Sequence, residues 1–240
     1  MLSYVVNRSM SRRPRPETPR LRPRVAPTDL TRIDFTEFTP EPVPFLGQAA
    51  YLQLEVFENL AKAVATAPDL SAKEGLSAAA GVALRKHHEL IAELRRLEVE
   101  PADVMAPFAP ALDRFRQATS GADWYELLLG IHITSGMLDD YFIRLAEGLP
   151  HDLRQRVRAI LGESRSAQVI EDALVQAIAA DHTLDDRLAL WGRSLVGDTL
   201  LIARSAIRAG SGDQPADVEP VFTELIASHT RRMDVLGLTA

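Results

Sequence analysis

The chain has 240 residues and a formal net charge of −6, with 46% hydrophobic and 6% aromatic residues. It contains no cysteine, which excludes disulfides, thiolate metal sites and cysteine nucleophiles. No apolar run approaches the roughly 20 residues of a membrane-spanning helix, and the arginine-rich start lacks the apolar stretch of a secretion signal. A soluble cytoplasmic protein is therefore expected. Abundant Ala, Leu, Arg and Glu favour helices over strands.

The first 43 residues are expected to be a disordered basic leader and lead-in. Seven arginines against one glutamate give residues 1–25 a charge of about +6, which leaves about −12 on the remainder. Five prolines between positions 14 and 27 oppose regular structure there. An acidic body binds nucleic acid poorly, because phosphate contacts supply most of such affinity, so only the tail is suited to an anionic partner. Met10 offers an alternative start that would remove residues 1–9.

Apolar residues spaced three and four apart predict two long helices in the first part of the chain. The first covers about 45–66 and ends before Pro68, because the residue preceding a proline disfavours helix. Its inward residues are Leu46, Ala49, Gln53, Val56, Leu60 and Ala63. The second begins at a capping box, Ser71-x-x-Glu74, and runs to about 97. Its inward residues are Leu76, Ala80, Leu84, His87, Ile91 and Leu94.

Three more long helices follow a connector whose prolines at 101, 107 and 110 favour short helical turns over one end of the bundle. The third helix begins at Asp123-x-x-Glu126, runs to 147 and faces inward with Trp124, Leu128, Ile131, Ser135, Leu138, Phe142 and Leu145. The fourth covers 151–180 with a bend at Gly162. Thr183-x-x-Asp186 caps a fifth helix to about 209, and Asp181-His182 before it is interpreted as capping rather than catalysis.

A loop at 210–215 and a final helix over 217–236 complete an all-α chain, since no strand-length alternating pattern competes. The predicted domains are the leader and lead-in over 1–43, a helical bundle over 44–209, and a loop with a C-terminal helix over 210–240.

Each of the first four long helices places a polar residue in the middle of its apolar stripe. These residues are Gln53, His87, Ser135 and Glu163, with Ser166 a turn later. Burying an unpaired amide, imidazole or carboxylate costs on the order of several kcal/mol, so such residues usually have partners or a function. Bundles that hold two metal ions take a Glu from two helices and a Glu-x-x-His pair from each of the other two. On that template only His87 and Glu163 are good ligands.

Further motifs carry a family resemblance over about 44–209. They are Leu46-Gly47, Ala50-Tyr51, Phe57-Glu58-x-Leu60, His87, Met105-Ala106-Pro107-Phe108, Leu112-Asp113-x-Phe115, Asp123-Trp124 and the block from Arg187 to Gly197. With them the chain resembles the MiaE-like, ferritin-like tRNA hydroxylases, in the short version found in high-GC bacteria. The resemblance implies a ferritin-like four-helix bundle with additional C-terminal helices, and a di-iron centre that activates O₂ to hydroxylate a prenylated adenosine in tRNA.

Carried over residue by residue, the resemblance places the family's ligands at Gln53, Leu84-x-x-His87, Ser135 and Glu163-x-x-Ser166. Two iron ions bring about four to six positive charges, which carboxylates must neutralise. We therefore expect a lost or impaired di-iron centre with no cofactor, in which His87 and Glu163 are vestigial ligands. These two are expected to form hydrogen bonds with Gln53 and Ser135. The protein is then a structural or regulatory partner, in a homo-oligomer or with an intact homologue.

Two other functions stay open. The first is an active non-haem di-iron oxygenase, with iron as cofactor, that draws ligands from Glu58, Asp139, Asp140 or a partner chain. Asp139 and Asp140 serve there if the register of the third helix is displaced by one turn. The second is a bundle that binds a small apolar ligand in the space left by Leu84, Ser135 and Ser166.

Overall fold

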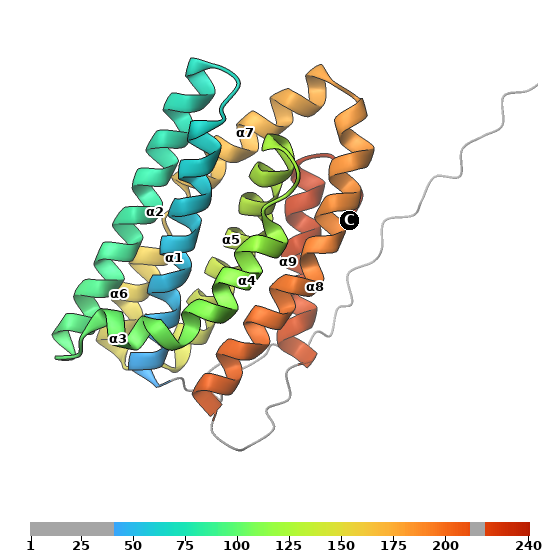
Figure 1. The fold of residues 1–240 in the computed structure, drawn as a ribbon. Helices are drawn as coiled ribbons and strands as arrows, with labels where there is room; N and C mark the ends of the chain where they lie inside the picture. Colours follow the sequence, from blue (N-terminus) through green and yellow to red (C-terminus); the bar gives the residue numbers. More distant parts are fainter. Residues whose placement is uncertain (1–40, 212–218) are drawn as a thin grey trace, which may run out of the picture. The chain divides into compact units, whose positions relative to one another are not determined.

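The structure, a computed structural model, describes the backbone of residues 41–211 and 219–240 and the side chains of 41–202 and 222–240 (Figure 1). The predicted leader up to residue 40 and most of the loop at 210–215 lie outside these ranges. The described part holds helices and no strand, so the all-α prediction is confirmed. The longer helices are α1 (Pro42–Ala65), α2 (Leu70–Arg96), α4 (Ala109–Thr119), α5 (Trp124–Leu145), α6 (His151–Leu161), α7 (Arg165–Ala180), α8 (Thr183–Ser211) and α9 (Glu219–Val235). The short ones are α3 (Pro101–Met105), η2 (Ala106–Phe108) and η3 (Ala146–Gly148).

The bundle is built from α1, α2, α5 and a fourth helix that is divided into α6 and α7. Helix α2 packs on α1, α6 and α7, while α5 packs on α1, α6 and α7 from the other side. Helix α8 packs on α5, α4 and α1, and α9 packs on α5 and α8 (Figure 1). Within the described part of the chain, every helix is too short or too polar to cross a bilayer.

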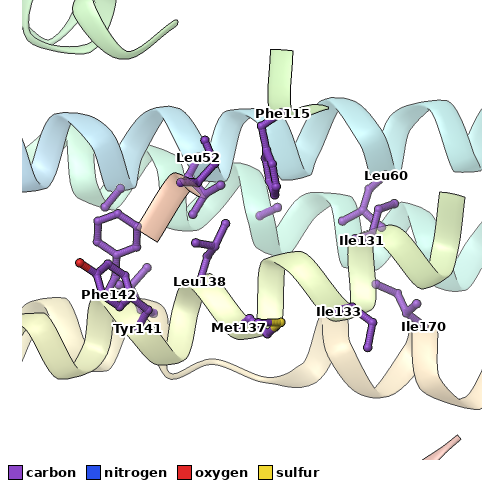
Figure 2. Packing of buried hydrophobic residues seen from close by; sticks show 14 of the residues in the cluster. Leu52, Leu60, Phe115, Ile131, Ile133, Met137, Leu138, Tyr141, Phe142 and Ile170 are labelled. Atoms are coloured by element: carbon purple, nitrogen blue, oxygen red, sulfur yellow. The ribbon is translucent and has the colours of Figure 1, made fainter. Parts of the chain in front are cut away.

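The core lies along α5. Figure 2 shows Leu138 of α5 pointing toward Leu52 of α1, and Phe115 reaching in from α4. The rings of Phe45 and Phe142 meet edge to face with their centroids 5.4 Å apart. Each fully buried side chain of this kind contributes about 1.5–3 kcal/mol of transfer free energy. This apolar packing holds the polar groups described below at fixed positions.

The helices differ from the sequence prediction in three places. Helix α1 begins at Pro42 rather than 45, because proline at the first helical position lacks an N–H that would be unbonded anyway. The predicted fourth helix over 151–180 breaks after Leu161, where the Gly162 N–H bonds back to the Arg158 carbonyl at 3.0 Å. The connector holds an 11-residue helix, α4, in addition to short turns.

The start of α2 is capped by Asp69 and not by the predicted Ser71. An Asp69 carboxylate oxygen accepts a hydrogen bond from the Ala72 N–H at 2.8 Å. At the start of α5 the predicted cap is confirmed, since Asp123 accepts a hydrogen bond from the Glu126 N–H at 2.9 Å. At α8, Asp181 accepts from the Thr183 N–H at 2.9 Å, which agrees with the capping interpretation of Asp181. Thr183, predicted as the cap of this helix, is instead its first residue and donates its hydroxyl to Asp181.

Exchanging the α2 cap tests this assignment. Asp69→Ala is expected to lower the free energy of unfolding by about 1 kcal/mol, because it leaves an N–H at the helix start without its acceptor. Ser71→Ala is the matched control and is expected to change stability by only a few tenths of that amount. Urea unfolding followed by circular dichroism measures both. A larger loss at Ser71 than at Asp69 would return the cap to the predicted position.

Candidate functional site in the bundle core

Polar groups from α1, α2, α5 and α6 meet at one point in the core, which we call the Lys86 hub. It consists of the side chains of Gln53, Lys86 and Asp139 with the main-chain carbonyl of Leu161. Lys86 Nζ donates to Asp139 Oδ2 at 2.8 Å and to the Leu161 carbonyl at 3.0 Å. Gln53 Nε2 donates to Asp139 Oδ1 at 2.7 Å. Both oxygens of the carboxylate therefore have a donor.

The hub is shielded from water. Gln53 and Lys86 are 2% and 5% exposed, and the Asp139 side chain is 18% exposed. Burial raises the pKa of Asp139, while the Lys86 ammonium and the Gln53 amide oppose that rise by favouring the carboxylate. The ion pair therefore compensates charges that would be costly if left alone.

Lys86 also caps a helix end. Leu161 is the last residue of α6, and carbonyls in the last turn of a helix have no partner within the helix. A cation there also interacts favourably with the negative end of the helix dipole. The break in the fourth helix thus supplies the carbonyl that Lys86 binds.

His87 is buried beside α1 rather than in the hub. Its Nδ1 lies 2.8 Å from the Ala50 carbonyl, so Nδ1–H is the donor. Burial lowers the pKa of His87, which favours the neutral ring. Its hydrogen bond is to the backbone of α1 and not to Gln53, Ser135 or Glu163, as the sequence had suggested.

The other predicted positions do not converge. The Ser135 hydroxyl donates to the Ile131 carbonyl of its own helix at 2.6 Å. Glu163 lies in the break between α6 and α7, where Arg85 is 3.0 Å and Arg165 is 2.9 Å from its carboxylate oxygens. The hydrogen bond from Arg85 lowers the pKa of Glu163.

Leu84 and Ser166 are only half-buried. The predicted mutual hydrogen bonding of Gln53, His87, Ser135 and Glu163 is therefore wrong. Only Gln53 of this set lies in the hub.

At the hub, helix α5 has the register displaced by one turn that the sequence analysis considered as an alternative for the third helix. Asp139, one turn after Ser135, points to Gln53 and Lys86. Asp140 instead turns to α9, where its carboxylate accepts from Ser228 at 2.8 Å and from Arg232 at 2.9 Å.

Glu58 belongs to a second polar cluster, between α1 and α4, where Arg116 contacts Glu55 and lies 3.7 Å from Glu58. Tyr51 donates to Asp113 at 2.8 Å in the same cluster. Burial raises the pKa of Glu55 to about 7, with Arg116 opposing the rise. Of the three acids proposed as substitute ligands, only Asp139 reaches the hub.

Lys86 is the residue of the hub that the sequence analysis missed. The buried face of α2 includes Ala79, Ala83 and Leu90, and both Lys86 and Glu93 interrupt it. Both are nearly fully buried, and Glu93 accepts from Arg156 of α6 at 2.9 Å. Two charged residues seven positions apart on one alanine-rich stripe were the available signal.

A family model described as a ferritin-like domain of actinomycetes matches residues 37–209, most of the chain. The chain belongs to this ferritin-like family. A search of curated proteins gave no match.

The donors at the core of this ferritin-like protein do not fit a pair of iron ions. Within the described residues, no group of three or more His, Asp or Glu side chains is placed to hold a metal ion. The one carboxylate of the hub already has two donors, one of them a cation. At an effective dielectric constant of about 20, a doubly charged ion about 4 Å from an ammonium group is repelled by roughly 8 kcal/mol.

Two surface pockets of about 450 Å³ lie away from the hub. One lies between the starts of α2 and α5 and the middle of α7, and includes Leu76, Trp124 and Ala173. The other lies along α6, and includes His151, Arg154 and Arg158. Leu84, Ser135 and Ser166 line neither of them, so the ligand space predicted beside these residues is not part of either pocket.

Proposed function

We propose that this ferritin-like protein works without a di-iron centre, as a structural or regulatory partner of other proteins or of a second copy of itself. The observation that carries the proposal is the 2.8 Å contact between the Lys86 ammonium and Asp139, the only carboxylate of the hub. A chain that dedicates its central carboxylate to its own lysine leaves too little negative charge for two multivalent cations.

Two leucines of α8 are exposed on one side of the helix. Leu190 and Leu201 are 67% and 63% exposed, and a Cβ added to Gly197 between them would meet no atom within 4 Å. Residues 7 and 11 positions apart lie within about 20° of one line on a helix. Single exposed leucines are common on monomeric proteins, so the proposal rests on the hub and not on this side of α8.

The alternative function is the tRNA hydroxylation that the MiaE-like resemblance implies. That reaction requires a di-iron centre, for which the bundle offers Asp139, His87 and Glu163. Their present partners are Lys86 for Asp139, the α1 backbone for His87 and two arginines for Glu163. The ion pairs of Asp139 and Glu163 would have to be broken to bind iron, which leaves only His87 Nε2 as a ready ligand, so the metal-free function is the better supported one.

Metal analysis of the purified chain tests the proposal. After aerobic, iron-replete expression without a metal-binding tag, plasma mass spectrometry is expected to find well under one iron per chain. The hub offers one carboxylate where two irons need several, which is the reason for this expectation. About two irons per wild-type chain would overturn the proposal and restore the oxygenase.

A further inference from the structure

We infer that the Lys86 ammonium occupies the position of a bound cation, so that the hub is a cation site whose ion is supplied by the chain itself. This inference rests on the proposed metal-free function. It adds that the oxygen atoms of the hub are arranged around one positive charge. Replacing Lys86 by an acidic residue would then create a binding site for a divalent ion.

The geometry of the hub supports this inference. A metal ion in a helical bundle connects helices because side chains from several of them coordinate it. Lys86 Nζ does the same with two oxygens from different elements, Asp139 Oδ2 of α5 at 2.8 Å and the Leu161 carbonyl of α6 at 3.0 Å. Gln53 of α1 lies against the other oxygen of the same carboxylate. The ammonium of α2 thus connects α5 and α6, and the carboxylate that it binds is connected to α1 through Gln53.

The chemistry of the surrounding atoms predicts the class of ion. The oxygen atoms at the hub belong to the Asp139 carboxylate and the Leu161 carbonyl, and such hard ligands suit Ca²⁺ and Mn²⁺ better than zinc. His87 is not one of the groups that meet at the hub, since its Nδ1–H donates to the Ala50 carbonyl of α1. An ion at the hub would therefore be held by oxygen alone.

Converting the hub to acid provides the test. The double variant Gln53→Glu with Lys86→Glu places two new carboxylates beside Asp139 and removes the ammonium. We expect Mn²⁺ or Ca²⁺ to raise its melting temperature by about 5–10 °C at a concentration about 100-fold above the dissociation constant. Wild type under the same conditions is expected to show no shift. Scanning fluorimetry with and without a chelator measures both.

Two further variants keep the test decisive if the double variant folds poorly. Lys86→Gln removes the charge without adding acid and is expected to show no metal response. Glu55→Gln with Glu58→Gln alters acids outside the hub and serves as a control for adventitious binding. A double variant that is indifferent to both ions, or unfolded at every ion concentration, would overturn this inference while leaving the metal-free function standing. Iron in the wild-type chain would instead sink the proposed function.

Discussion

Replacing Lys86 by methionine is expected to lower the free energy of unfolding by about 3–5 kcal/mol, because it leaves the Asp139 carboxylate without its cation. Methionine keeps the length and most of the volume of the side chain, so little of the loss comes from a cavity. The Leu161 carbonyl loses its donor in the same variant. Urea unfolding followed by circular dichroism measures the change.

A double-mutant cycle separates the ion pair from packing. Asp139→Asn alone leaves the Lys86 ammonium buried without a carboxylate. The double variant carries neither charge, and the asparagine oxygen still accepts from Gln53. We expect the double variant to be more stable than the sum of the two single losses implies, by about 2 kcal/mol. Simple additivity would show that Lys86 and Asp139 do not act as a pair.

Acidification is expected to weaken the fold through His132 of α5. This residue is 4% exposed, and neither ring nitrogen has a hydrogen-bond partner among the residues that the structure describes. Burial and, to a smaller extent, the nearby Arg232 guanidinium of α9 together lower its pKa to about 4. The folded chain therefore holds the ring neutral, whereas the unfolded chain protonates it near its ordinary pKa of about 6.5.

The direction of the effect follows from which state binds the proton first. Above about pH 6.5 both states are neutral at this ring, and its contribution to stability is complete. Between about pH 6.5 and 4 only the unfolded state binds the proton, so stability falls by up to about 3 kcal/mol. Below about pH 4 the loss levels off.

Comparison with His132→Leu separates the pH dependence that comes from His132 from that of the buried carboxyl groups. Leucine is close in volume and cannot titrate, so the stability difference between the two proteins should change with pH across that window. Glu55 and Asp139 titrate equally in both proteins and cancel. Urea titrations at about pH 7.5, 5.5 and 4 supply the curve. Parallel curves for wild type and variant would contradict the prediction.

Helix α5 shows what the sequence was able to predict. Its capping residue Asp123 was identified correctly, and Leu128, Ile131, Leu138 and Phe142 are buried as predicted. The capping residue fixes where the helix begins, and a single strongly apolar stripe fixes which side of it faces the core. The all-α bundle followed from several such helices, and its ferritin-like character from the family resemblance.

Helix α2 shows why the site was harder to predict. Two apolar stripes compete there, one through Leu84 and Ile91 and one through Ala79 and Ala83. The structure buries the alanines and leaves Leu84 and Ile91 half-buried, because small side chains allow α1 and α2 to approach closely. That rotation moves Lys86 inward.

Lysine side chains are usually exposed to water, so the sequence pattern did not place Lys86 in the core. Lys86 is buried only because Asp139 and the Leu161 carbonyl, 53 and 75 residues away in the sequence, are there to receive it. No local pattern encodes those two contacts. Pairings at such a distance are set by tertiary packing.

X-ray diffraction at the iron absorption edge, from crystals grown with excess ferrous iron, tests most directly whether Lys86 stands where a metal ion would bind. We predict no anomalous peak within bonding distance of Asp139, and Lys86 Nζ in contact with both Asp139 and the Leu161 carbonyl. An iron peak bound to Asp139, with the lysine turned away from it, would contradict this.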